Sequence, residues 1–333
     1  MGKKIVLFFV AFSIILLPYF SGQAGAKPFY EGKTITLIVT TKPGGGYDFY
    51  GRLMAKFMKK YLPGSTIIVK NMPGAGHIIG CNAIYKAKPN GLTFGTFNRA
   101  LALAQVAELK GIKFDQGKMS WLGVACTEVF SFVVSNKFKD LEAVRKTERM
   151  RLVSDGIGAI NYLTPALFAY MTGWKNFKIA TGYAGGEKEL VIMRGEMDGL
   201  FVSWASFVKF VQAGHGHPIL FIGKNKPKGY ESVPFIQDVI TEKKYKPIVD
   251  LLIAVQSMGR PFAGPPGIPP DRLKVLQDAF KKACNDPELL KIAAKAQKPI
   301  DYVSAEEAET YTRSLLQLTP DVVEQIKKAH GIQ

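Results

Sequence analysis

Cysteine and histidine are scarce in this chain, and they do not form the patterns through which they usually carry chemistry. Only three of the 333 residues are cysteines and four are histidines. Cys81, Cys126 and Cys284 are far apart and form no C-x-x-C pair, so a disulfide between Cys81 and Cys126 is neither required nor excluded. His215 and His217 could share a metal, but no third ligand is near them in sequence, which favours a pair of loop histidines. We therefore expect no metal site and no cofactor.

Sequence motifs of nucleotide sites and of common hydrolases are also missing. The chain contains no G-x-x-x-x-G-K-[ST], no G-x-S-x-G and no H-E-x-x-H. The glycines at 44–46 fail the dinucleotide pattern G-x-G-x-x-G because Phe49 occupies the third glycine position. Those at 74–80 lack the acidic residue expected about 20 positions later, since the next acid is Glu108. A nucleotide-binding enzyme is therefore disfavoured, and we predict no catalytic residue.

Acidic residues are few compared with basic ones. Lysine and arginine number 44 against 27 aspartates and glutamates, which gives a net charge of +17. The lysines are spread along the chain, and the densest groups, around 224–228 and 243–246, are too small to predict a nucleic-acid face. A basic surface that steers small anions toward a cleft is the milder interpretation.

Long apolar runs are absent except at the start of the chain. Two lysines, an apolar run over 5–17 and an A-x-A ending at Ala26 are typical of a secretory signal peptide. The run is shorter than the roughly 20 residues that span a membrane. We expect residues 1–26 to be removed and the protein to be exported to a bacterial periplasm, with a retained N-terminal anchor as the alternative.

The region 35–80 contains the same unit twice. An apolar run over 35–39 predicts a buried strand, a glycine turn follows at 44–46, and apolar residues spaced as one helix face come next. A strand at 66–69, a turn at 73–76 and a helix beginning near His77 repeat the order. Helix N-termini carry unpaired N–H groups and a partial positive charge, so two such loops at one sheet edge predict an anion cradle.

Similar strand–turn–helix units continue along the chain and divide it into two α/β domains. Strands at 121–124 and 130–134 are separated by a polar break that suits a crossover, and the chain is expected to return near 251. We predict domain 1 at 27–127 plus 251–333 and domain 2 at 128–250. The proline-rich segment 262–270 is predicted to be a rigid loop, and Ser304-x-x-Glu307 to be a helix capping box.

An ordered series of motifs resembles the TctC or Bug family, the periplasmic solute-binding receptors of tripartite tricarboxylate transporters. The resemblance covers nearly the whole chain after residue 26. The motifs that carry it are PGGGYD at 43–48, NMPGAG at 71–76, PNG at 89–91, YAGG at 183–186, GEMD at 195–198, VP at 233–234 and GPPGIP at 264–269.

This resemblance implies a type II periplasmic-binding-protein fold: two α/β domains, each a mixed sheet flanked by helices, that close on a small carboxylate. It also implies a monomer that binds an organic acid without catalysis and delivers it to membrane transporter subunits. The ligand-binding residues it implies lie in the glycine loops and in the second domain: Gly44, Gly45, Gly46, Tyr47, Asp48, Gly74, Ala75, Gly76, His77, Ser154, Gly156, Gly158, Ala159, Tyr183, Gly185 and Asp198.

Some of these positions depart from the family pattern or have a purely structural alternative. Tyr47 replaces a small hydroxyl residue, His77 replaces glycine, Ala159 lacks a hydroxyl, and Tyr162 lies near a common histidine position. A pocket adapted to an aromatic or differently shaped acid is the hypothesis that follows. Asp48 could cap its helix or tie the glycine loop, Asp198 could be a turn acid, and His77 could be solvent-exposed.

Two other functions remain open from the sequence. An exported enzyme could use the same cleft with His77 as its acid–base group, and a sensor component could present a ligand to a membrane regulator. Turnover of the ligand distinguishes the enzyme from the receptor.

Overall fold

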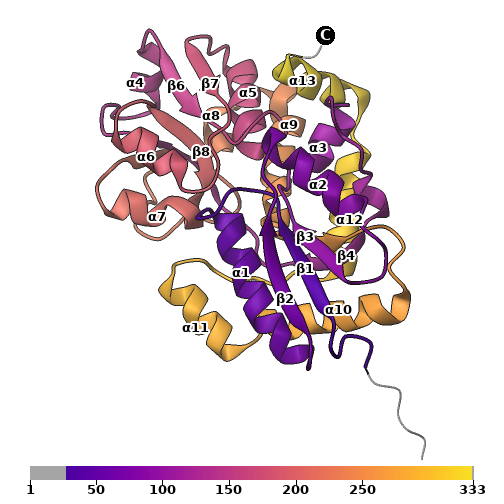
Figure 1. Ribbon diagram of the computed structural model, residues 1–333. Helices are drawn as coiled ribbons and strands as arrows, with labels where there is room; N and C mark the ends of the chain where they lie inside the picture. Colours follow the sequence, from indigo (N-terminus) through magenta and orange to yellow (C-terminus); the bar gives the residue numbers. More distant parts are fainter. Residues whose placement is uncertain (1–27, 332–333) are drawn as a thin grey trace, which may run out of the picture.

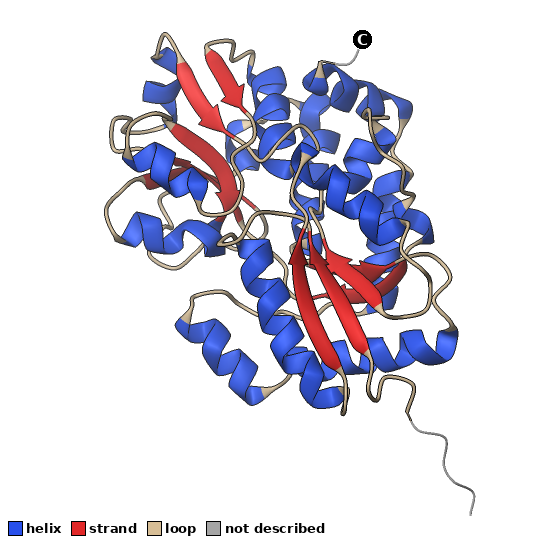
Figure 2. Cartoon of the chain, viewed as in Figure 1, coloured by secondary structure: helices blue, strands red, loops and turns tan. Residues whose placement is uncertain are grey.

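Two lobes, each built on its own five-stranded sheet, make up the computed structural model, which describes residues 28–331 (Figure 1). The predicted signal peptide lies outside the described residues. Helices flank both sheets (Figure 2). The predicted class, two mixed sheets with flanking helices, is therefore confirmed.

Lobe 1 is organised around the strand order β2-β1-β3-β10-β4. The three strands β2, β1 and β3 run parallel, whereas β10 is antiparallel to both of its neighbours. The strands of this sheet are β1 (Thr34–Val39), β2 (Thr66–Asn71), β3 (Thr93–Thr96), β4 (Ser120–Val124) and β10 (Pro261–Gly264). Its helices are α1 (Gly46–Met58), α2 (Ile78–Tyr85), α3 (Leu101–Val106), α10 (Pro270–Cys284), α11 (Pro287–Lys295) and α12 (Ala305–Leu316).

Lobe 2 has the order β7-β6-β8-β5-β9, with β6 parallel to β7 and β8 and with β5 antiparallel to β8 and β9. Its strands are β5 (Phe130–Val134), β6 (Met150–Val153), β7 (Phe177–Ala180), β8 (Gly199–Ser203) and β9 (His217–Ile222). Its helices are α4 (Leu141–Lys146), α5 (Ile160–Thr172), α6 (Glu187–Met193) and α7 (Trp204–Gln212).

The chain crosses between the lobes after β4 and returns between β9 and β10. The return segment forms α8 (Ile236–Val239) and α9 (Lys246–Ala254). The predicted boundary at residue 251 falls inside α9, and the domain limits stay a prediction. The last helix, α13 (Pro320–His330), packs against α5 of lobe 2. Short 3-10 turns complete the fold: η1 (Lys59–Tyr61), η2 (Ala75–His77), η3 (Gln116–Lys118), η4 (Lys243–Tyr245) and η5 (Val255–Met258).

One apolar core runs through both lobes. It joins Leu101 of α3, Phe168 of α5, Ile248 of α9 and Ile326 of α13, each 0% exposed. Separate clusters fill the space under α1 and α10 and the space under α6 and α7. Burial of apolar surface on this scale holds the lobes together on the side of α9 and α13.

The sequence prediction fails in part of the segment 262–270. Its first residues belong to β10, an inner strand of lobe 1 that pairs with β3 and β4. The strand is only four residues long, and the glycine–proline loop directly after it hides its pattern. Phe262 and Ala263 are fully buried, which is what an inner strand requires. The capping box at Ser304 and Glu307 is confirmed, because both of its hydrogen bonds are present.

None of the helices within residues 28–331 combines the length and the apolar character that crossing a membrane requires.

Candidate functional site

A cavity lies between the two lobes and takes residues from both. It offers about 70 Å³ in which the centre of a water molecule can move, which is room for several waters or for part of a small organic molecule. Lobe 1 contributes Thr41, Gly44, Gly45, Gly46, Tyr47, Asn98, Arg99, Arg260 and Lys298. Lobe 2 contributes Phe130, Asp155, Ile160, Asn161, Gly185, Lys188, Glu189, Val202, Ser203, Ser206 and Phe207.

Sheet topology explains why these residues meet. Gly44 follows the carboxyl end of β1, and Arg99 follows the carboxyl end of β3, which runs parallel to β1. In lobe 2, Asp155 follows β6 and Ser203 ends the parallel strand β8. Carboxyl ends of parallel strands lie at one edge of a sheet, and ligands of α/β proteins bind there. The cavity is the space between two such edges.

Arg99 is the most unusual residue in the cavity. It is 3% exposed, yet its Nε and Nη2 atoms have no hydrogen-bond partner among the described residues. Its Nη1 donates to the carbonyl oxygen of Gly259 at 3.4 Å, and its guanidinium lies 4.8 Å from the centre of the Phe130 ring. Burial lowers the pKa of Arg99, although a guanidinium stays charged in proteins. A buried charge without a counter-ion is costly, so this group is prepared for an anion.

Arg260 is equally buried but has a counter-ion. Its Nη2 lies 2.9 Å from Oε1 of Glu128, and both side chains are nearly inaccessible. The same Nη2 donates to the hydroxyl oxygens of Ser203 and Ser206 at 3.2 and 3.1 Å. Burial alone would lower the pKa of Arg260, but Glu128 together with Tyr47, Cys126 and Tyr50 outweighs burial and raises it. Its guanidinium also lies 4.4 Å from the ring centre of Tyr47.

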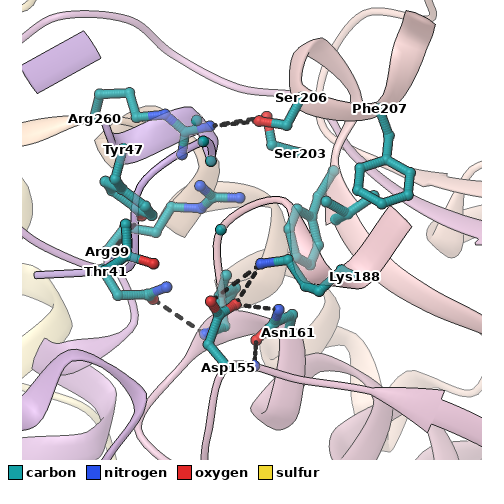
Figure 3. A pocket seen from close by; sticks show the side chains of 18 of the residues that line it. Thr41, Tyr47, Arg99, Asp155, Asn161, Lys188, Ser203, Ser206, Phe207 and Arg260 are labelled. Atoms are coloured by element: carbon teal, nitrogen blue, oxygen red, sulfur yellow. Dashed lines mark hydrogen bonds and ion pairs between the residues drawn. The ribbon is translucent and has the colours of Figure 1, made fainter. Parts of the chain in front are cut away.

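A second buried ion pair comes from lobe 2. Lys188 Nζ donates to both oxygens of Asp155 at 3.1 and 2.8 Å, and Asn161 donates to Asp155 at 2.5 Å. Burial would raise the pKa of Asp155, but the Lys188 ammonium holds it below its usual value. Figure 3 shows Arg99 and Lys188 pointing into the cavity from opposite sides, with Asp155 beneath Lys188.

The rim of the cavity carries Lys298 and Glu189. Lys298 Nζ donates to the carbonyl oxygen of Ala205 at 2.9 Å, which ties the α11–α12 linker to lobe 2. The pKa of Lys298 is lowered to about 8, chiefly by burial and then by Arg260, while the carboxylates of Glu128 and Glu189 oppose the shift. Burial raises the pKa of Glu189. Because Lys298 also lines a groove on the outer surface, we place it at the mouth of the cavity.

The two lobes touch through glycine-rich loops. A Cβ atom added to Gly76 would lie 2.6 Å from the backbone nitrogen of Gly158, and one added to Gly45 would lie 3.0 Å from the Cα of Gly185. Side chains larger than hydrogen would therefore keep the lobes apart. Asn98 Oδ1 accepts a hydrogen bond from the Ile160 backbone N–H at 3.1 Å across the same junction. These contacts between the lobes correspond to a closed conformation.

An ion pair at the surface adds to this junction. Lys42 Nζ donates to both carboxylate oxygens of Glu187 at 2.8 and 2.9 Å. Both side chains are more than two-fifths exposed, so solvent screens the pair and it guides closure rather than stabilises it.

Five of the sixteen predicted ligand residues line the cavity: Gly44, Gly45, Gly46, Tyr47 and Gly185. The other eleven lie outside its lining: Asp48, Gly74, Ala75, Gly76, His77, Ser154, Gly156, Gly158, Ala159, Tyr183 and Asp198. The second glycine loop, 74–76, packs on the 156–158 turn of lobe 2 instead of facing the cavity. Tyr162, another departure from the family pattern, stacks on the ring of His330.

The two acidic members of the second group, Asp48 and Asp198, have structural contacts of their own. Asp48 Oδ2 accepts from the Gly44 N–H at 3.1 Å, so it ties the first glycine loop. Asp198 is at the opposite end of β8 from the cavity residue Ser203 and forms a bidentate pair with Arg151. These two carboxylates therefore stabilise a loop and a strand end and do not line the cavity.

His77 is buried, which contradicts the alternative of simple solvent exposure. Its Nδ1 lies 2.6 Å from the hydroxyl oxygen of Thr40, and its ring packs edge-on against Tyr47. The backbone at His77 has φ +79°, a left-handed conformation that glycine adopts without strain, which explains why a glycine is expected at this position. Burial lowers the pKa of His77 to about 4, so the imidazole is neutral at pH 7.

Sequence reasoning missed the charged residues of the cavity. Arg99 and Arg260 are each a single cation within an otherwise apolar stretch, FNRALALA and SMGRPFAG. An isolated arginine directly after a buried strand is the signal that could have identified Arg99. Lys188 lies among other charges at the start of α6, and nothing in its surroundings distinguishes it from a solvated lysine.

Metal and thiol chemistry have no support in the part of the chain that the structure describes. Residues 28–331 contain no group of three or more histidine, cysteine or acidic side chains that could hold a metal. Cys81, Cys126 and Cys284 are all free and buried. Burial raises the pKa of each thiol, so none is an activated nucleophile.

Comparisons with known proteins agree with this architecture. A model of the family described as "Tripartite tricarboxylate transporter family receptor" matches residues 51–327. The "UPF0065 protein in gbd 5'region" of Cupriavidus necator is 22% identical over 91% of this chain and 90% of its own length. A protein of Agrobacterium vitis, the "UPF0065 protein in the TAR-I ttuE-ttuC' intergenic region", is 35% identical over 25% of this chain and only 22% of its own length.

Solved structures share the fold. The periplasmic binding protein BugD superposes with a TM-score of 0.76 at 17% identity, covering 91% of this chain and 99% of BugD. MatC from Rhodopseudomonas palustris, solved with bound malate, superposes with a TM-score of 0.71 at 16% identity, covering 90% of this chain and 99% of MatC. The predicted two-domain periplasmic-binding-protein fold is thereby confirmed.

Proposed function

Because this chain belongs to the tripartite tricarboxylate transporter receptor family, a family of solute-binding proteins, we propose that it captures a small organic carboxylate between its two lobes. The bound acid is then delivered to the membrane subunits of a transporter of the tripartite tricarboxylate type. MatC, which has the same fold, is described with malate bound. By analogy with MatC, we propose that the ligand of this chain is also a carboxylate.

The unpaired guanidinium of Arg99 carries the proposal. It is buried in the cavity with two of its nitrogens, Nε and Nη2, unpartnered, and its charge has no carboxylate partner among the described residues. The first turn of α1, at Gly46 and Tyr47, lines the same cavity and adds the partial positive charge of a helix N-terminus. An anionic ligand satisfies both groups at once.

The proposed ligand contacts divide between side chains and backbone. Arg99 and Arg260 supply charge, and Gly44, Gly45 and Gly46 allow close approach of the backbone of lobe 1. The remaining predicted residues of the second glycine loop and of the 154–159 turn serve closure in this proposal, since they touch each other across the lobes. Closure then buries the acid and presents one surface to the transporter.

In this proposal the protein binds its ligand and does not convert it. An enzyme that used His77 as its acid–base group would need that imidazole in the cavity, but His77 is buried outside the lining against Thr40. A role as ligand-presenting sensor remains a second use of the same closed form. We further propose export through residues 1–26, a periplasmic location and a monomeric receptor.

A binding panel on the full-length chain tests the proposal. Isothermal titration with small organic acids and with the corresponding neutral amides should give saturable binding of one acid per chain and none for the amides. An acid present at 100 times its Kd should stabilise the fold by about 2.7 kcal/mol in thermal melts. The acid should be recovered chemically unchanged after prolonged incubation. Absence of binding by every acid, or conversion of the bound acid, would refute the proposal.

A further inference from the structure

Two of the cations around the cavity form ion pairs, whereas Arg99 forms none among the described residues. Arg260 pairs with Glu128 at 2.9 Å, and Lys188 pairs with Asp155 at 2.8 Å. At the rim, Lys298 and Glu189 line the cavity with opposite charges. Four formal cations thus face three formal carboxylates, which leaves an excess of one positive charge. A ligand with a single negative charge balances the cavity.

The free atoms of Arg99 have the geometry for one carboxylate. Its Nε and Nη2 lie on the same edge of the guanidinium, the edge that binds both oxygens of a carboxylate in parallel hydrogen bonds. The same chain contains such a pair: Arg151 Nε and Nη2 donate to the two oxygens of Asp198 at 2.9 and 2.8 Å. The free Nε and Nη2 of Arg99 are thus the same two atoms with which Arg151 binds a carboxylate.

Two polar side chains that lobe 2 places in the cavity, Asn161 and Ser203, already form hydrogen bonds within the protein. Asn161 donates to Asp155, and its Oδ1 accepts from Ser154 Oγ at 3.0 Å. Ser203 donates to Glu128 and accepts from Arg260. A second carboxylate on a ligand would face the Asp155 carboxylate, and its donors in lobe 2 would be the Ser206 hydroxyl and the third N–H of Lys188, whose charge Asp155 already balances.

Lobe 2 instead offers an apolar wall. Phe130, Ile160, Val202 and Phe207 line the cavity, and each is at most 6% exposed. Phe207 faces the cavity from the side opposite Arg260 and Tyr47 (Figure 3). Apolar surface removed from water contributes about 25 cal/mol for each Å², so the wall favours a hydrocarbon or aromatic body. Lobe 1 therefore supplies the charge and lobe 2 the apolar contact.

From the single free guanidinium edge and the apolar wall opposite it, we infer that the ligand is a monocarboxylate with an apolar, ring-sized or branched body. The carboxylate accepts from Nε and Nη2 of Arg99, and the body packs against Phe130, Val202 and Phe207. This inference rests on the proposed function and narrows it from organic acids in general to this class. Arg99 is then the residue that fixes both the orientation and the charge of the ligand.

Matched acids test the inference in the full-length chain. Isothermal titration compares hexanoate with adipate and benzoate with terephthalate, so that each pair differs by one carboxylate on a similar body. Benzamide serves as the neutral analogue of benzoate. The monocarboxylate of each pair should bind about tenfold tighter or more than the dicarboxylate, and benzamide should not bind.

Variants of Arg99 assign the preference to that residue. Arg99→Gln should weaken benzoate binding about 100-fold, because it removes one partner of a buried charge pair. Arg99→Lys keeps the charge but lacks the fork and should also bind weakly. Arg145→Gln, an exposed arginine of α4 outside the cavity lining, should leave affinity unchanged.

The outcomes separate this inference from the broader proposal. Tighter binding of the dicarboxylate in either pair, or unchanged benzoate affinity in Arg99→Gln, would overturn the monocarboxylate inference and leave the receptor proposal standing. Failure of all four acids to bind would overturn the monocarboxylate inference, and failure of the wider panel of organic acids would overturn the receptor proposal as well. Circular dichroism melts of each variant confirm that a loss of affinity does not reflect loss of the fold.

Discussion

Arg99 and Arg260 both donate a guanidinium N–H to the carbonyl oxygen of Gly259, at 3.4 and 3.2 Å. Two buried cations thus meet at one carbonyl, and only Arg260 has a carboxylate partner, Glu128. Like charges brought together away from water repel each other, and an anion between them relieves that repulsion. A bound anion therefore stabilises the closed form, so ligand binding and closure of the lobes are coupled.

Replacing Arg99 with methionine should stabilise the unliganded protein and abolish binding. An apolar side chain of similar length removes the uncompensated charge, and such replacements of buried ions are neutral or stabilise by about 1–4 kcal/mol. Urea unfolding of Arg99→Met without ligand measures the first effect, and titration with an organic acid measures the second. Arg145→Met, at an exposed site, should change stability by no more than about 0.5 kcal/mol. A large destabilisation in Arg99→Met would mean that the arginine is a structural residue.

Closure should depend on the absence of a side chain at Gly185. A Cβ atom there would overlap the Pro43 carbonyl oxygen of lobe 1 and lie 3.0 Å from the Lys42 carbonyl oxygen. Gly185→Ala should therefore lower ligand affinity about tenfold or more, because the lobes no longer meet. Gly182→Ala is the matched control: its φ of +99° gives a comparable backbone strain, but its Cβ would meet nothing within 4 Å. Equal affinities of the two variants would argue against the closed form as the binding form.

Ligand affinity should fall as the pH rises through the titration of Lys298. The pKa of this lysine is lowered to about 8 in the unliganded protein, chiefly by burial, and a bound anion favours the protonated ammonium. Above pH 8 binding must take up a proton, so the Kd should rise by up to about tenfold for each pH unit. Titrations between pH 7 and 9.5 measure the slope, and Lys298→Arg should flatten it because arginine stays charged. A slope that persists in Lys298→Arg would assign the titration to another group.

Buried His77 should make the fold less stable in mild acid. Burial lowers its pKa from 6.5 to about 4, so the unfolded chain binds a proton at a higher pH than the folded protein does. The free energy of unfolding is therefore unaffected by the protonation of His77 above pH 6.5. It falls as the pH drops from 6.5 toward 4, by an amount on the order of 3 kcal/mol. Denaturant melts at several pH values test the prediction with His77→Asn, since asparagine tolerates the left-handed backbone.

The pH effect of His77 has one competing source in the described chain. Burial lowers the pKa of His330 to about 4 as well, and its ring stacks on Tyr162. The double variant His77→Asn/His330→Asn should therefore show a flatter stability profile between pH 4 and 6.5 than either single variant. An unchanged profile in His77→Asn would show that the pKa of this imidazole is the same in the folded and unfolded states.

The sequence predicted the elements well because most of them carry a local signal. The glycine turn at 44–46 sits between an apolar strand and an amphipathic helix, and both elements form as predicted. The strands on either side of the polar break at Thr127 and Glu128 also form, and they belong to different sheets. By contrast, β10 was missed because a four-residue strand followed by a glycine–proline loop has no periodicity to detect.

The cavity itself could not be predicted from local patterns. Arg99, Arg260 and Lys188 come from three segments that are far apart in sequence, and only the juxtaposition of two sheet edges brings them together. The pairing that leaves Arg99 free depends on Glu128, a residue that reads as part of a polar crossover. The glycine loop 74–76 shows the converse, since its motif is evident but its partner is the 156–158 turn and not the cavity.

Native mass spectrometry of the protein, expressed with its own N-terminal segment for export and purified from the periplasm, tests the central claim most directly. The account predicts one small carboxylic acid bound per chain in the wild type, released on denaturation and identified by its mass, and an empty Arg99→Met variant prepared in parallel. A ligand without a carboxyl group, or equal occupancy in Arg99→Met, would contradict the account. So would a wild-type protein that is empty and gains no mass from any organic acid added at millimolar concentration.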